Sequence, residues 1–114
     1  MKLSAIADSI AIDPRKLTLY ALDPDSPYGK HKALVFERAL GITLKNYNIL
    51  VTQIETKIAK AELSFHSADE FGKRYFADLE VAGAEGKRAM VRTGWFVASD
   101  TQVAQLATLY VKKR

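Results

Sequence analysis

Cysteine is absent from the 114 residues, and proline, histidine and tryptophan are scarce, with three, two and one residue respectively. Without cysteine there is no disulfide framework, no thiol nucleophile and no cysteine-based zinc site. The sequence also contains no glycine-rich phosphate loop, no pair of histidines at metal-ligand spacing and no serine-centred nucleophile elbow. These absences exclude the enzyme classes that carry such motifs, and we expect neither a metal nor a cofactor.

A long hydrophobic run is absent too. The N-terminal segment MKLSAIADSIAI carries Asp8 inside its apolar run, is too short to cross a bilayer, and lacks a signal-peptide core and cleavage site. We therefore expect a cytoplasmic protein that does not associate with membranes.

What the chain has in excess is positive charge. Seventeen Lys and Arg stand against 13 Asp and Glu, for a formal net charge of +4 and a pI of about 9.4. The cations gather at residues 30–32, 87–92 and 112–114. An anionic polymer such as RNA is therefore a plausible partner. A hydrophobic content of 48% and a length of 114 residues are typical of one globular domain, 1–114.

The first half of the chain has helical patterns. Residues 1–12 form an N-terminal arm, either a weak helix or a leading segment on the core, and 13–61 form the helical part. Asp13-Pro14 is typical of a helix start and predicts a helix over 14–22, which the prolines of 23–27 end. The segment from Pro27 to Gly41 predicts a second helix, with Ser26 as its cap, and a 3.6-residue period predicts a third over 43–61.

The second half alternates with a period of two and predicts strands within 62–112. The strands are expected near 61–66, 74–81, 87–97 and 104–112, with a polar turn at 67–72 and a hairpin loop at 82–86. Helices followed by strands indicate an α+β fold, with N-terminal helices packed on one face of a four-stranded antiparallel meander. The other face of the sheet would be free to meet a ligand.

His31 is the first candidate for chemistry. An imidazole accepts or donates a proton near neutral pH, and the neighbouring Lys30 and Lys32 can hold a phosphate. A metal-independent ribonuclease needs this combination, because a base activates the ribose 2′-hydroxyl while cations stabilise the charged phosphorane. The alternative is that His31 only caps or packs at the helix start, between solvated lysines.

Three residues on the predicted strands are further candidates. Arg92 lies mid-strand and either pairs with Asp78 or Glu80 across the hairpin or captures a phosphate with its two-pronged guanidinium. Thr108 and Tyr110 alternate on the last strand, and Tyr110 can donate a proton or stack on a base. The alternative for Tyr110 is a half-buried strand residue of ordinary β propensity.

Two other features have weaker functional interpretations. His66, Asp69 and Glu70 lie close together in sequence, but a loop with one histidine and two acids is normally solvated, so we expect no metal site there. Trp95 is expected in the core, with a stacking platform as the alternative.

The sequence also resembles a family of small, uncharacterised bacterial proteins. The shared pattern is KLTLYALDPDSPYGKHKALVFERALG from Lys16 to Gly41, followed by FGKRYFADLEV at 71–81, MVRTGWFV at 90–97 and LATLYV at 106–111. Relatives occur alone or as C-terminal domains of larger phage-head or toxin-like proteins. The element order is similar to the barnase–EndoU–colicin–RelE class of ribonuclease folds, which is an analogy of fold.

The resemblance implies a toxin-like, metal-independent endoribonuclease of a toxin–antitoxin or effector system. The family's recurring polar positions fall on Lys16, His31, Lys32, Arg92, Thr108 and Tyr110, with Gly29 permitting close backbone approach. His31, Tyr110 and Thr108 would be catalytic, and Gly29, Lys30, Lys32 and Arg92 would bind phosphate. The alternative is a non-catalytic antitoxin, immunity or accessory module with a cognate protein partner.

These two hypotheses make different structural predictions. A ribonuclease site requires His31, Lys32, Arg92 and Tyr110 to converge on one concave face. An interaction module predicts that they scatter and that an exposed apolar patch appears instead.

Overall fold

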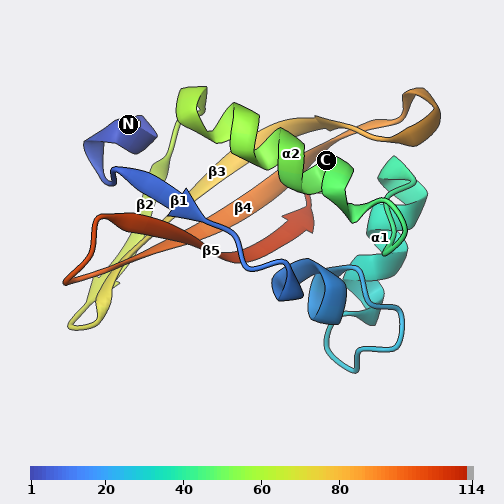
Figure 1. The fold of residues 1–114 in the computed structure, drawn as a ribbon, viewed down its shortest axis with the longest axis horizontal. Coiled ribbons are helices and arrows are strands. Elements are labelled where there is room, and N and C mark those ends of the chain that lie inside the picture. The colour runs from blue at the N-terminus through green and yellow to red at the C-terminus, as the bar shows by residue number, and fades with distance from the viewer. Residues whose placement is uncertain (113–114) are drawn as a thin grey trace.

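The structure is a computed structural model and describes residues 1–112, as Figure 1 shows. The domain is α+β. Its elements, in chain order, are η1 (Leu3–Ala5), β1 (Ser9–Ala11), η2 (Leu17–Ala21), α1 (Lys30–Leu40), α2 (Tyr47–Lys57), η3 (Ile58–Lys60), β2 (Ser64–Asp69), β3 (Gly72–Ala82), η4 (Ala84–Gly86), β4 (Arg88–Ala98) and β5 (Val103–Val111). The predicted basic C-terminal cluster ends at residues 113–114, which lie outside the described residues.

The sheet is mixed and has five strands, in the order β1-β5-β4-β3-β2. Strands β2 to β5 form the predicted antiparallel meander, but the prediction of four strands is wrong. The N-terminal arm adds β1, which pairs parallel to β5 with Ser9 opposite Val103. Because this pairing joins the two ends of the chain and spans three residues, the local pattern of residues 1–12 carried no signal for it.

The helices are shorter than predicted. The helix expected over 14–22 is a five-residue π-helical segment, η2. Helix α1 begins at Lys30 rather than Pro27, since Ser26 Oγ accepts the N–H of Gly29 at 3.1 Å and caps the turn there. Its predicted end is confirmed, because Gly41 adopts the left-handed conformation with φ of 65°. Among residues 1–112 no helix combines the length and apolar character that a membrane span needs.

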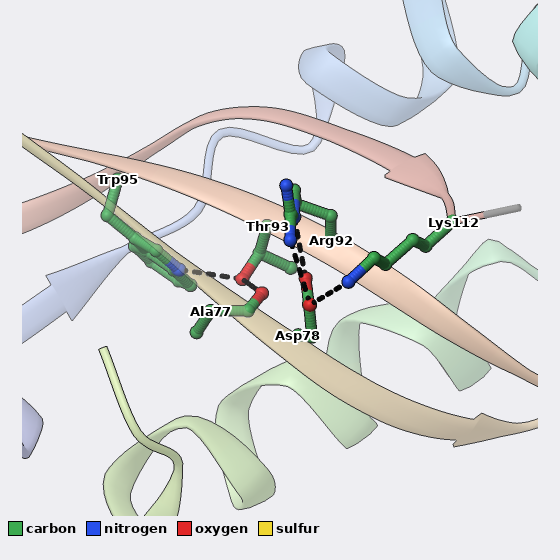
Figure 2. Close-up of polar contacts among 6 residues, drawn as sticks. All are labelled: Ala77, Asp78, Arg92, Thr93, Trp95 and Lys112. Atoms are coloured by element: carbon green, nitrogen blue, oxygen red, sulfur yellow. Dashed lines mark hydrogen bonds and ion pairs between the residues drawn. The ribbon is translucent and has the colours of Figure 1, made fainter. Parts of the chain in front are cut away.

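One face of the sheet forms the core, and the predicted alternation in β4 is confirmed. Val91, Thr93 and Trp95 are buried, and Trp95 is only 1% exposed, which makes it a core residue. Its Nε1–H donates to Thr93 Oγ1 at 2.8 Å, and that hydroxyl donates to the Ala77 carbonyl of β3 at 2.9 Å (Figure 2). Helix α2 covers this face, because the side-chain amide of Gln53 both donates to and accepts from the backbone of β3.

The opposite face of β3, β4 and β5 carries polar and aromatic side chains. We call it the open face. Helix α1 contacts β4 and β5 at one end of the sheet (Figure 1), so that residues of its first turn can reach the open face. The fold therefore brings the start of α1 to the strands that carry Arg92 and Tyr110.

Candidate functional site

The strand registers align the candidate strand residues in two rows across the open face. In the first row Asp78 of β3 lies opposite Arg92 of β4, which lies opposite Tyr110 of β5. In the second row Phe76, Gly94 and Thr108 are aligned in the same way. Each row joins three strands, so residues far apart in sequence become direct neighbours.

Arg92 forms the ion pair that the structural interpretation predicted. Its Nε and Nη2 donate to the two carboxylate oxygens of Asp78 at 2.8 and 3.0 Å (Figure 2). Lys112 Nζ binds the same carboxylate at 2.9 Å. The hydrogen bond from Arg92, with that from Lys112, lowers the pKa of Asp78 to about 2, although burial opposes the shift. Two cations therefore share one carboxylate, and the cluster of Asp78, Arg92 and Lys112 carries a net positive charge.

The Arg92 guanidinium is held from a second side. Its central carbon lies 4.4 Å from the centroid of the Phe76 ring, a cation–π contact. The Asp78 carboxylate, followed by the Tyr110 hydroxyl, raises the pKa of Arg92 further above its ordinary value. The guanidinium is thus charged and oriented before any ligand arrives.

Lys32 of α1 reaches the same place from outside the sheet. Its Nζ lies 3.3 Å from Thr108 Oγ1, to which it donates. The ammonium also lies 4.9 Å from the Tyr20 ring centroid and 5.8 Å from that of Tyr110. Within residues 1–112 Lys32 forms no ion pair with a carboxylate. Its ammonium group interacts instead with two aromatic rings and a hydroxyl.

Arg92, Phe76, Thr108 and Tyr110 line a cavity on the open face with a volume of about 290 Å³, and Lys32 contacts it through Thr108 and Tyr110. It is lined by His66, Arg74, Tyr75, Phe76, Arg92, Gly94, Trp95, Ala107, Thr108 and Tyr110. Gly94 in its floor leaves no room for a side chain, because a Cβ there would lie 2.6 Å from Thr108 Cγ2. A cavity of this size can hold a phosphate group together with part of the attached nucleoside.

His66 lines this cavity too, and its predicted place in a strand near 61–66 is confirmed, because it lies in β2. The polar turn predicted at 67–72 is wrong in its first part: β2 continues to Asp69, so His66 and Asp69 lie in a strand and not in a loop. A β-bulge sets Phe65 opposite Tyr75 and Ser67 opposite Arg74, leaving His66 as the extra residue. The alternation of Ser64 and His66 with Phe65 predicted this strand, but the turn-like composition of residues 67–72 hid its continuation to Asp69.

His31 and Lys30 lie elsewhere. They line a separate cavity of about 720 Å³ beside α1, together with Glu37 and Lys45. Neighbouring residues on a helix point in different directions, so Lys32 can reach the open face while His31 does not. The predicted convergence therefore includes Lys32, Arg92, Thr108 and Tyr110 and leaves out His31 and Lys30.

Gly29 is buried, and it permits a close approach between two segments of this chain and not of a ligand. A Cβ at this position would lie 1.8 Å from the Tyr20 carbonyl oxygen. The missing side chain thus lets α1 pack against η2, and this contact carries Tyr20 to its position beside Lys32.

Lys16 lies in a neighbouring cavity of about 600 Å³, which it lines with Arg15 and Tyr20. This cavity shares Ala107 and Thr108 with the one on the open face. We call these two adjoining cavities the basic groove: Lys16 lines one, Arg92 lines the other, and Lys32 contacts Thr108, which lines both. In the part of the chain that the structure describes, no group of three or more His, Asp or Glu is placed to hold a metal ion.

A family model matches the chain over almost its whole length. The family described as a domain of unknown function (DUF6883) matches residues 2–113. The chain belongs to this family. The match covers nearly the whole domain and includes the residues of the basic groove. No curated protein and no solved structure matches the domain.

Proposed function

We propose that this domain is a metal-independent endoribonuclease of the toxin-like kind, and that RNA binds in the basic groove. The observation that carries the proposal is that Arg92, Thr108 and Tyr110 line one cavity and that Lys32 contacts Thr108 and Tyr110 beside it. They come from α1, β4 and β5, and their arrangement supports a site over a scatter of solubilising charges. For this reason we favour the enzyme over the interaction module.

The charges suit a phosphodiester. Arg92 uses Nε and Nη2 to bind Asp78, which leaves Nη1 to donate to a phosphate oxygen. Lys32, which has no carboxylate partner within residues 1–112, supplies a second cation. Both would stabilise the extra negative charge of a pentacoordinate phosphorane, which a metal ion supplies in other nucleases.

The aromatic residues suit a single strand. Tyr20 and Tyr110 lie beside Lys32, and Phe76 lies beneath Arg92. Bases of single-stranded RNA stack on such rings and on guanidinium planes, whereas a duplex keeps its bases stacked on each other. We therefore expect single-stranded RNA to be the substrate.

The test is cleavage of a labelled single-stranded RNA by the purified protein in excess EDTA. Lys32→Ala and Tyr110→Phe should slow cleavage by at least roughly tenfold, while Lys45→Ala, an exposed lysine outside the groove, should leave the rate unchanged. A DNA strand of the same sequence should remain intact, because it has no 2′-hydroxyl. Failure of the wild-type protein to cleave RNA, or equal rates for all variants with folding verified, would show that the proposal is wrong.

A further inference from the structure

His66 lines the cavity on the open face. It comes from β2, the strand at the far side of the sheet from Tyr110 of β5. The bulge at residues 65–67 gives β2 one residue more than β3 at this point, so that His66 and Ser67 together oppose Arg74. Bulges redirect side chains and are frequent beside active sites.

The imidazole has a fixed partner. Its Nδ1 lies 3.0 Å from Ser67 Oγ, the next residue of the bulge. When Nδ1 carries the ring proton it donates to this hydroxyl, and Nε2 is left as the proton acceptor. The bulge therefore supplies both the position and the orientation of a base.

The placement of the two proton-transfer groups suits an in-line reaction. Strands β2 and β5 are separated by β3 and β4, which amounts to three interstrand spacings. His66 also lies at the level of Arg74 and Tyr75, three to four residues along β3 from Asp78, to whose row Tyr110 belongs, so the two backbones are on the order of 18 Å apart. His66 and Tyr110 line the same cavity from these two separate strands. An in-line displacement needs the attacking and the leaving oxygen on opposite sides of phosphorus.

We propose that His66 is the general base of the ribonuclease site and that Tyr110 is its general acid. This assignment rests on the proposed function. Nε2 of His66 takes the proton of the 2′-hydroxyl as the 2′-oxygen forms its bond to phosphorus. The bond from phosphorus to the 5′-oxygen breaks, and that oxygen takes the Tyr110 proton. The products are a 2′,3′-cyclic phosphate and a free 5′-hydroxyl, and water returns the protons between the two residues.

The charged groups around His66 fit this role. Arg74 of β3 lines the cavity beside it and is paired with Asp69 of β2, Nη1 to Oδ2, at 2.8 Å. Tyr75 of β3, Arg92 of β4 and Tyr110 of β5 complete the ionisable lining of the cavity within the described residues. No carboxylate lines this cavity, and Asp69 and Asp78, which pair with its arginines, are both bound in ion pairs, so neither is placed to replace His66 as the base.

The experiment compares the two histidines of the chain. His66→Ala and His31→Ala are both exposed substitutions, and only His66 lines the cavity on the open face. Single-turnover cleavage in EDTA should fall roughly 10²- to 10⁴-fold for His66→Ala and stay at the wild-type rate for His31→Ala. Added imidazole should restore part of the His66→Ala rate, and the acidic limb of the wild-type pH–rate profile should disappear. Affinity for a 2′-O-methyl RNA, which cannot be cleaved, should be unchanged.

The outcomes separate this assignment from the proposed function. If the wild type cleaves RNA and His66→Ala keeps its rate and pH profile, the assignment is wrong while the ribonuclease proposal stands. Loss of activity in His31→Ala alone would also overturn it. A His66→Ala protein that loses affinity for the 2′-O-methyl RNA in proportion to its rate would show a binding residue and not a base. A wild type that cleaves no RNA overturns both.

Discussion

Replacing Asp78 by asparagine tests the ion pair that orients Arg92. The substitution keeps the size of the side chain and one carbonyl acceptor but removes the charge that Arg92 and Lys112 share. The Asp78 side chain is 22% exposed, so solvent screens this interaction only in part. We expect the Asp78→Asn protein to fold with a lower free energy of unfolding.

The pKa of Asp78 sets the size of the loss and its pH dependence. A fall from 3.8 to about 2 on folding corresponds to about 2 kcal/mol of stability at neutral pH. Because the pKa is lowered in the folded state, this stability is fully present above pH 4 and disappears as the pH falls through 2. The difference between wild type and Asp78→Asn should be about 2 kcal/mol at pH 6 and about half of that at pH 3.

Urea unfolding, followed by the fluorescence of Trp95, measures this difference at both pH values. Asp13→Asn is the matched control: the pKa of Asp13 is also lowered to about 2, chiefly by its hydrogen bond from Arg15, but the pair is exposed and local. The loss for Asp13→Asn should therefore be clearly smaller. An equal loss for Asp78→Asn at pH 6 and pH 3, or none at either, would refute the reasoning.

Two further substitutions test the packing that supports the site. Gly29→Ala would place a Cβ 1.8 Å from the Tyr20 carbonyl oxygen and should lower the free energy of unfolding by roughly 2 kcal/mol or more, whereas Gly86→Ala, with φ of 75° and nothing within 4 Å, should lower it by about 1 kcal/mol. Equal losses in thermal denaturation would contradict the packing argument. Thr93→Val leaves the buried N–H of Trp95 without its acceptor and should lower the free energy of unfolding by about 1–3 kcal/mol in urea. A Thr93→Val protein as stable as wild type would show that this hydrogen bond is dispensable.

The meander could be predicted because its pattern is local. Val91, Thr93 and Trp95 alternate with Arg92 and Gly94, and a period of two places each set on one face of the sheet whatever packs against it. For the same reason, Asp78 was a predictable partner of Arg92 across a hairpin. The parallel strand β1 was not predictable, because its three residues gain their hydrogen bonds from β5, about ninety positions later in the chain.

The candidate site was predictable only in part. Arg92, Thr108 and Tyr110 were assigned to strands by alternation, and the registers then aligned them. Whether Lys32 or His31 joins them depends on the rotation of α1 about its axis, which packing against β4 and β5 decides. Lys32 lies one turn before the buried Phe36 and is half-buried, whereas His31 is exposed. Amphipathicity therefore indicates which of the two faces the fold, but not which strands that face of the helix meets.

The sequence by itself determined the α+β order, the basic character and the side of the sheet on which each strand residue lies, because composition and periodicity are properties of neighbouring residues. Only the tertiary structure decided that His66, and not His31, lies by Arg92 and Tyr110. A bulge in β2 and the packing of α1 place these side chains, and both depend on contacts between segments distant in sequence. The choice between two histidines is therefore a result of the fold and cannot be read from either local pattern.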